Sequence, residues 1–177
     1  MLRRMLPVCL LSFLAVGWAA TGRSDDDKKT DADTKVAAGT EVSLTPVEVT
    51  PSDKMDDEGR VPVTVKPAKE AKKVKMPDQA WVLGFHPEKK DGGVGVAGVP
   101  EDSPLHHMRV TAGKEPEGDW QADVGDIITH ANGYAVKSVE DLICAISLAK
   151  NPEDVQLVIK DVNTGKETVF YVTATKK

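Results

Sequence analysis

The chain has 177 residues, which is room for one domain of ordinary size with extensions but not for a catalytic domain beside a second module. Its 40% hydrophobic and 29% charged residues are typical of a soluble protein, whereas 11 prolines, 14 glycines and only 5% aromatics indicate that part of the chain is unfolded. The net charge of −5 argues against a nucleic-acid partner.

The first twenty residues have the pattern of a secretory signal peptide. Arg3 and Arg4 form a basic start, an apolar run follows from Met5 to Val16, and Gly17-Trp18-Ala19 offers a cleavage motif. We therefore expect residues 1–20 to be removed and the protein to be exported, to the periplasm or the extracellular space. The alternative is an uncleaved membrane anchor, although the apolar stretch falls short of the ~20 residues that a spanning helix needs.

The two cysteines exclude a disulfide framework. Cys9 lies inside the apolar run that cleavage would remove, so Cys144 would remain alone, without a partner for a disulfide or a cysteine-based zinc site. A lipid anchor is not expected either, because no cysteine follows the apolar run. No activating base is visible beside Cys144, so we expect a half-buried structural thiol.

Residues 21–76 are expected to be a disordered linker rich in proline and charge. They contain no aromatic residue and few large apolar ones, and so cannot bury enough surface to offset the entropy of ordering. Residues 41–49 and 60–65 alternate apolar and polar side chains as strands do, but each piece is interrupted by proline. These pieces could dock at a sheet edge; the favoured interpretation is an extended linker.

The rest of the chain, residues 77–177, is expected to form the domain. In its first half the sequence predicts short strands and one short helix. Strands are expected at 81–85 and 94–99, separated by a turn-rich loop over 86–93. Ser103-Pro104 predicts the start of a helix that runs to about Met108. An exposed polar loop follows over 109–123, and its Trp120 is either a contact for a partner or a lid on the core.

The second half predicts two hairpins and a longer helix. Asn132-Gly133 is a tight-turn signal between two strands, and Asn163-Thr164-Gly165-Lys166 is another between strands at 155–159 and 168–173. Between the hairpins, Ser138 with Asp141 resembles a capping box at the start of an amphipathic helix, which Asn151-Pro152 ends. The domain is thus expected to hold five or six strands and two helices.

The order of these motifs resembles a bacterial-type PDZ domain, as carried by envelope serine proteases of the HtrA kind, over about one hundred residues. The resemblance rests on Gly125-Asp126-Ile127-Ile128, Asn132-Gly133 and Asp141-Leu142 with the closing hairpin, and on Leu83-Gly84-Phe85 upstream, similar to the loop that binds a terminal carboxylate. It implies an α+β fold, a partly open antiparallel β-barrel or sandwich. An insert of about ten residues before Gly125, containing Trp120, departs from the family pattern.

The resemblance implies that an extended peptide adds to the sheet as a further strand beside a helix. The peptide's terminal carboxylate would meet backbone N–H groups of the loop, where Gly84 allows close approach. Ile146 could equally be an ordinary core residue. The residues implied for peptide binding are Val82, Leu83, Gly84, Phe85, Ile143 and Ile146.

No enzymatic activity, cofactor or metal is expected. The segment before residue 77 has no histidine from which a catalytic triad could be assembled. His106 and His107 are adjacent and would point about 100° apart on a helix, so they cannot form a metal site without further ligands. His86 and His130 are interpreted as ordinary surface residues.

The sequence therefore predicts an exported, monomeric, non-catalytic module that captures protein C-termini or extended segments, and that touches a membrane only if the signal peptide stays uncleaved. One alternative is an accessory or regulatory subunit of a separate envelope protease. Another is a structural domain whose groove is occluded by its own insert or linker.

Overall fold

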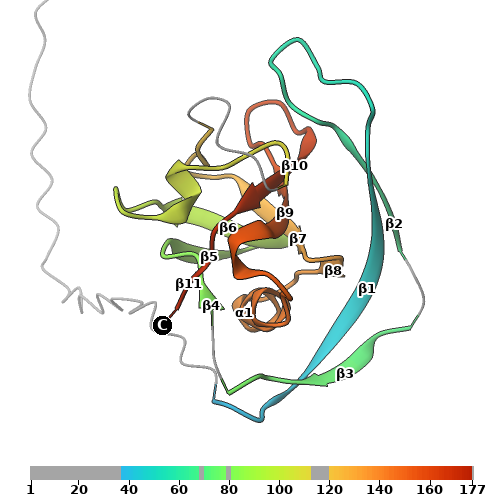
Figure 1. Ribbon diagram of the computed structural model, residues 1–177, viewed down its shortest axis with the longest axis vertical. Coiled ribbons are helices and arrows are strands. Elements are labelled where there is room, and N and C mark those ends of the chain that lie inside the picture. The colour runs from blue at the N-terminus through green and yellow to red at the C-terminus, as the bar shows by residue number, and fades with distance from the viewer. Residues whose placement is uncertain (1–36, 68–69, 79–80, 113–119, 177) are drawn as a thin grey trace, which may run out of the picture. The chain divides into compact units, whose positions relative to one another are not determined.

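The computed structural model describes residues 37–176 apart from 68–69, 79–80 and 113–119 (Figure 1). All of them belong to one unit, Asp31–Lys177. The expected signal peptide over 1–20, the first part of the expected linker over 21–36, and residues 113–119 of the insert lie outside the described residues. Within the described residues, no helix is both long and apolar enough to cross a membrane.

The described residues form antiparallel strands around a single α-helix, α1 (Val139–Ser147), with two short 3-10 turns, η1 (Pro104–His106) and η2 (Pro152–Asp154). The strands are β1 (Glu41–Pro51), β2 (Val63–Pro67), β3 (Lys72–Lys75), β4 (Trp81–Val82), β5 (His86–Lys90), β6 (Gly93–Gly98), β7 (Ile127–Ala131), β8 (Tyr134–Ala135), β9 (Val155–Lys160), β10 (Glu167–Val172) and β11 (Thr175–Lys176).

The strands β5-β6-β7-β9-β10 form a curled half-barrel, and α1 lies at its open side (Figure 1). β7 also pairs with β8, which continues the sheet to β1, while β4 and β11 form a separate two-stranded ribbon. The helix packs against β1, β4 and β7. This antiparallel α+β architecture agrees with the expected fold class at the level of a half-barrel with a helix.

Local signals in the second half of the chain are confirmed. Asn132 and Gly133 have positive φ angles of 48° and 76°, as a two-residue hairpin turn between β7 and β8 requires. Ser138 accepts from the N–H of Asp141 while the Asp141 carboxylate accepts from the N–H of Ser138, which completes the expected capping box.

The helix expected from Ser103 to about Met108 is wrong beyond one turn. The Ser103 side chain does accept from the N–H of Leu105, but the chain then leaves the helical path. The N–H of Met108 donates to the carbonyl of Trp120, and the N–H of Arg109 donates to the carbonyl of Tyr171 on β10. Extended pairing with the half-barrel therefore replaces further helical turns.

Another difference lies in residues 86–93, expected to be a turn-rich loop, because residues 86–90 form the strand β5. Pro87 and the charged residues around it were typical of a turn, but proline and charge are also tolerated on an edge strand. β5 pairs with β6 on one side, with a register shift between His86 and Pro87.

The largest correction concerns residues 41–75, expected as extended linker, which form β1, β2 and β3 in the structure. We call these three strands and the described residues that connect them the N-terminal arm. One edge of β1 pairs with β2 and β3 in succession, and its middle pairs with β8, where Thr45 lies opposite Ala135. Leu44 is fully buried, so the arm contributes to the core. The structure therefore shows the alternative in which these alternating segments dock at a sheet edge.

Trp120 of the insert packs against β10 of the half-barrel. Its ring centroid lies 6.0 Å from that of Phe170, and the Arg60 guanidinium carbon lies 5.6 Å from the Trp120 ring centroid. Arg60 Nη1 in turn donates to Asp161 Oδ2 at 2.6 Å. Of the two interpretations of Trp120, the structure favours the lid on the core.

Candidate functional site

The strand β5 has one free edge in the described part of the chain. Its inner edge pairs with β6, and neither the N-terminal arm nor the described part of the insert pairs with its outer edge. The arm pairs with β8 and reaches β10 at Pro62, while the insert meets β10 at Tyr171. An unpaired strand edge leaves backbone N–H and C=O groups that an extended peptide can use.

Alternation along β5 separates a face toward α1 from an outer face. Lys89 lies opposite Val94, which is buried in the core, so both side chains point to the same inner side. The side chains of Glu88 and Lys90 instead lie over Gly95 on the outer face. A Cβ atom added to Gly95 would lie 2.8 Å from Glu88 Cγ and 2.5 Å from Lys90 Cγ. Glycine at position 95 makes room for these two side chains, which form an ion pair at 2.9 Å.

The helix α1 presents one row of side chains to β5 and β4. Val139 lines a cleft together with Lys89 of β5, and Ser147 Oγ accepts from the N–H of Trp81 at 3.1 Å. Ile143 lies between them at a spacing of four residues, so it shares their face of the helix. Val139 and Ile143 are both half-buried at the margin of the core. We call the strip between β5 and this row of α1 the groove; the cleft lined by Lys89 and Val139 forms one end of it.

The loop Leu83-Gly84-Phe85 connects β4 to β5 at the Trp81 end of this groove. Gly84 is exposed and has a φ angle of 60°, a conformation that favours glycine. The Leu83 carbonyl accepts from Ser103 Oγ at 2.9 Å, which holds the loop against the half-barrel. Among the described groups, no acceptor takes a hydrogen bond from the N–H groups of Leu83, Gly84 or Phe85. Free N–H groups of this kind suit an anion.

The six residues implied for peptide binding divide between groove and core. Gly84 is exposed, and Val82, Phe85 and Ile143 are half-buried, which leaves part of each side chain open to a ligand. Leu83 and Ile146 are 2% and 1% exposed, so their side chains belong to the core and only the backbone of Leu83 is available.

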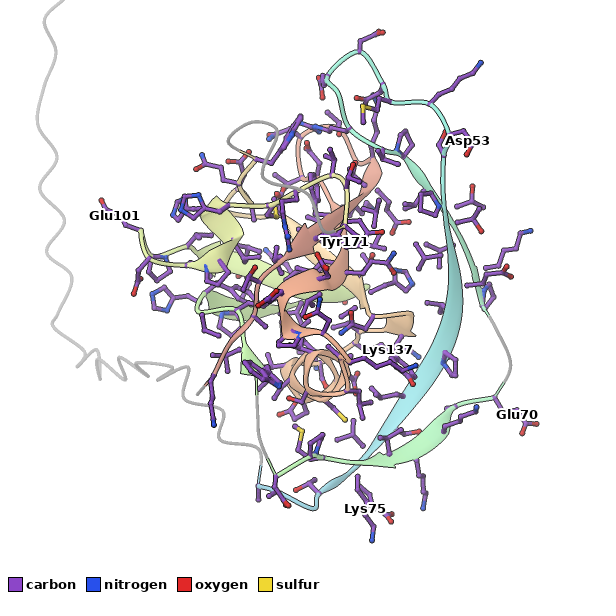
Figure 2. All side chains as sticks on the ribbon, viewed as in Figure 1. Asp53, Glu70, Lys75, Glu101, Lys137 and Tyr171 are labelled. Atoms are coloured by element: carbon purple, nitrogen blue, oxygen red, sulfur yellow. The ribbon has the colours of Figure 1, made fainter. Side chains whose placement is uncertain are left out.

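Sequence reasoning missed the other end of the groove. A cleft of about 230 Å³ opens there, between the end of β5 and the start of α1. Figure 2 shows Lys137 where the chain enters the helix. The alternation of β5 could have pointed to Lys89, but only after residues 86–90 had been recognised as a strand. The lining residues are Lys89, Gly93, Val94, Lys137, Ser138, Val139 and Glu140.

His106, His130 and Cys144 lie on separate elements, η1, β7 and α1. His106 lies against Gln121 at 3.0 Å, whereas His130 is on β7 beside Thr129. Within the described residues, no group of histidines, cysteines and carboxylates is arranged to hold a metal ion. Cys144 is fully buried rather than half-buried, and its burial raises the pKa of the thiol, with Asp141 adding to the effect.

Asp126, just before β7, is buried, at 6% exposure. Burial raises its pKa, against hydrogen bonds from the backbone N–H groups of Val162 and Asp123. These bonds tie together the loops before β7 and after β9, so the carboxylate has a structural role.

The fold and groove define an antiparallel half-barrel with an open strand edge beside a helix. Comparison with family models and with curated proteins finds no match to this chain.

Proposed function

We propose that the protein is an exported, non-catalytic, PDZ-like module that binds protein C-termini or extended segments by adding them as a strand to β5. The observation that carries this proposal is the free edge of β5 beside the half-buried row of α1, ending at a loop with unused N–H groups. The peptide backbone would pair with β5, and its terminal carboxylate would accept hydrogen bonds from the loop.

The apolar end of the groove indicates the ligand's last side chain. Val82, Phe85 and Ile143 each leave part of an apolar side chain exposed near the loop. An apolar terminal residue would cover these surfaces and remove them from water. The groove is small compared with a standard protein interface, so an affinity in the micromolar range, ~−8 kcal/mol, is expected.

The test uses the purified chain with its N-terminal arm intact, because a fragment starting at Pro77 would lack the buried Leu44. A library of peptides with free C-termini is screened by fluorescence anisotropy, and the hits are remade with amidated ends. We expect micromolar binding of peptides that end in an apolar residue, with about tenfold or greater loss on amidation, since a charge-assisted hydrogen bond is removed.

Two variants separate the groove from the rest of the surface. Ile143→Gln should weaken binding because it places an amide on the apolar row, whereas Val162→Gln changes an exposed valine on the turn after β9 and should leave binding unchanged. Urea denaturation verifies that both variants fold. The proposal fails if no peptide binds, or if both variants affect binding equally.

A further inference from the structure

The cleft at the far end of the groove has a lysine on each wall. Lys89 comes from the inner face of β5 and Lys137 from the turn that precedes α1, and both are exposed. Between them, buried Val94 and half-buried Val139 contribute apolar surface. The cleft thus combines an apolar lining with two cations at its rim.

These two lysines are not neutralised by the protein itself. Neither forms an ion pair with any residue that the structure describes, in contrast to Lys90, which is paired with Glu88 on the outer face. Asp141, close in sequence, accepts from the backbone N–H groups of Lys137 and Ser138 at 3.0 and 3.1 Å, so its carboxylate is already engaged. Glu140 is the single acidic residue among those that line the cleft. The charges at the rim favour an anionic side chain.

The direction of the ligand fixes where that side chain would sit. A carboxylate held at Leu83-Gly84-Phe85 lies before β5 in the chain, so the peptide runs antiparallel to the strand. Antiparallel strands pair residue by residue at about 3.4 Å per residue. Lys89 is four positions beyond Phe85, which places it beside the peptide residue about three or four positions before the last one.

We infer that, given the peptide-binding function proposed above, the preferred ligand carries an aspartate or glutamate three or four residues before its apolar C-terminus. This acidic side chain enters the cleft between Lys89 and Lys137, while the peptide backbone pairs with β5. The ligand class is therefore a C-terminal segment with an acidic residue followed by an apolar end, and not simply any apolar terminus.

The experiment compares peptides of about ten residues that share a free C-terminal valine and differ only at these two positions, with glutamate, glutamine or lysine in each. Anisotropy titrations with the purified chain should show glutamate binding about two- to fivefold tighter than glutamine, the size expected for an exposed ion pair. Lysine should bind more weakly than glutamine. High salt should shrink these differences, because exposed charges are screened.

The matched variants are Lys89→Gln, Lys137→Gln and Lys90→Gln. The first two should reduce the preference for glutamate over glutamine, and Lys90→Gln should keep it, because Lys90 lies on the outer face of the same strand. Equal binding of the glutamate and glutamine peptides, or equal effects of Lys89→Gln and Lys90→Gln, would overturn the inference while leaving the proposed function standing. If none of the peptides binds, the proposed function fails and the inference with it.

Discussion

Asp126 and His130 are ionisable side chains of the half-barrel; Asp126 is buried and His130 is half-buried. Burial lowers the pKa of His130, and the nearby Glu167 opposes this only in part. His130 Nδ1 lies 2.9 Å from Thr129 Oγ1, so the ring has a polar neighbour inside the sheet. The sequence predicts an ordinary surface residue at His130, because the exposure of a side chain on β7 depends on flanking strands that lie far away in the chain.

The lowered pKa of His130 predicts a loss of stability in mild acid. The unfolded chain then binds a proton more readily than the folded chain, so the free energy of unfolding falls as the pH drops below about 6.5. His130→Gln should flatten this dependence, measured as urea midpoints at pH 7.5 and 5.5. His86→Gln, at an exposed position on β5, serves as control. A steep dependence that survives in His130→Gln would assign the effect to another group.

Asp161 is expected to make the free energy of unfolding depend on pH in a second, more acidic range. Burial tends to raise its pKa, but hydrogen bonds from the backbone N–H groups of Thr164 and Asn163 and from Arg60 outweigh burial and hold the pKa below the usual value. Its stabilising contribution is therefore present near neutrality and is lost as the pH falls through the acidic range, below the window of His130.

At the scale of elements, the N-terminal arm acts as part of the core rather than as a tether. β1 contacts α1 on a side of the helix that would otherwise face water, and Val42 and Leu44 are buried there. The outer residues of the arm, such as Glu70 and Lys75, project away from the half-barrel (Figure 2). The polar composition of the arm therefore reflects its outer face.

Truncating Leu44 tests whether the arm unfolds together with the rest. Leu44→Ala should lower the free energy of unfolding by about 2–5 kcal/mol, since it removes a fully buried side chain and leaves a cavity. Ser43→Ala, at the adjacent exposed position, should have little effect. Urea denaturation of both variants gives the comparison. Similar small effects would mean that the arm is not part of the cooperative unit.

Elements with local signals could be predicted from the sequence, and those with remote partners could not. The Asn132-Gly133 turn and the capping box at Ser138 depend on residues within a few positions of each other, and both were found. β1 was missed because its partner β8 in the main sheet lies far along the chain and because Pro46 interrupts its pattern. The structure places Pro46 opposite Tyr134, at the point where β1 changes partners.

The candidate site shows the same division. Of the residues that the resemblance implied, Gly84 and Ile143 are at least partly exposed, but Ile146 is core. Whether a residue on a helix faces the groove depends on how the helix is rotated against the sheet. The cleft at Lys89 needs β5 to be a strand, which no short-range pattern indicated.

At the scale of the whole molecule, a cluster around Arg60 joins the arm, the insert and the half-barrel. Arg60 contacts Asp161 at 2.6 Å and Glu58 at 3.2 Å, and lies over the ring of Trp120. The Arg60 and Asp161 side chains are 21% and 16% exposed, so this ion pair is only partly screened by solvent.

Removing the guanidinium should loosen all three segments together. Arg60→Gln is expected to lower the free energy of unfolding by about 1–3 kcal/mol, because it leaves a largely buried carboxylate with one hydrogen bond fewer. Lys54→Gln, an exposed residue of the same hairpin, is the control. Urea denaturation followed by tryptophan fluorescence measures both. Indistinguishable midpoints for the two variants would contradict a fastening role.

The pairing of β1 with β8, and of β4 with β11, also governs when the protein can fold. Thr45 of β1 pairs with Ala135, and Trp81 of β4 pairs with Lys176, so each strand needs a partner that is synthesised much later. Such distant pairings make folding slow, because long loops must close before their contacts form. For a protein on the proposed export route, this delay would keep the nascent chain unfolded, and so competent for translocation, until it has crossed the membrane.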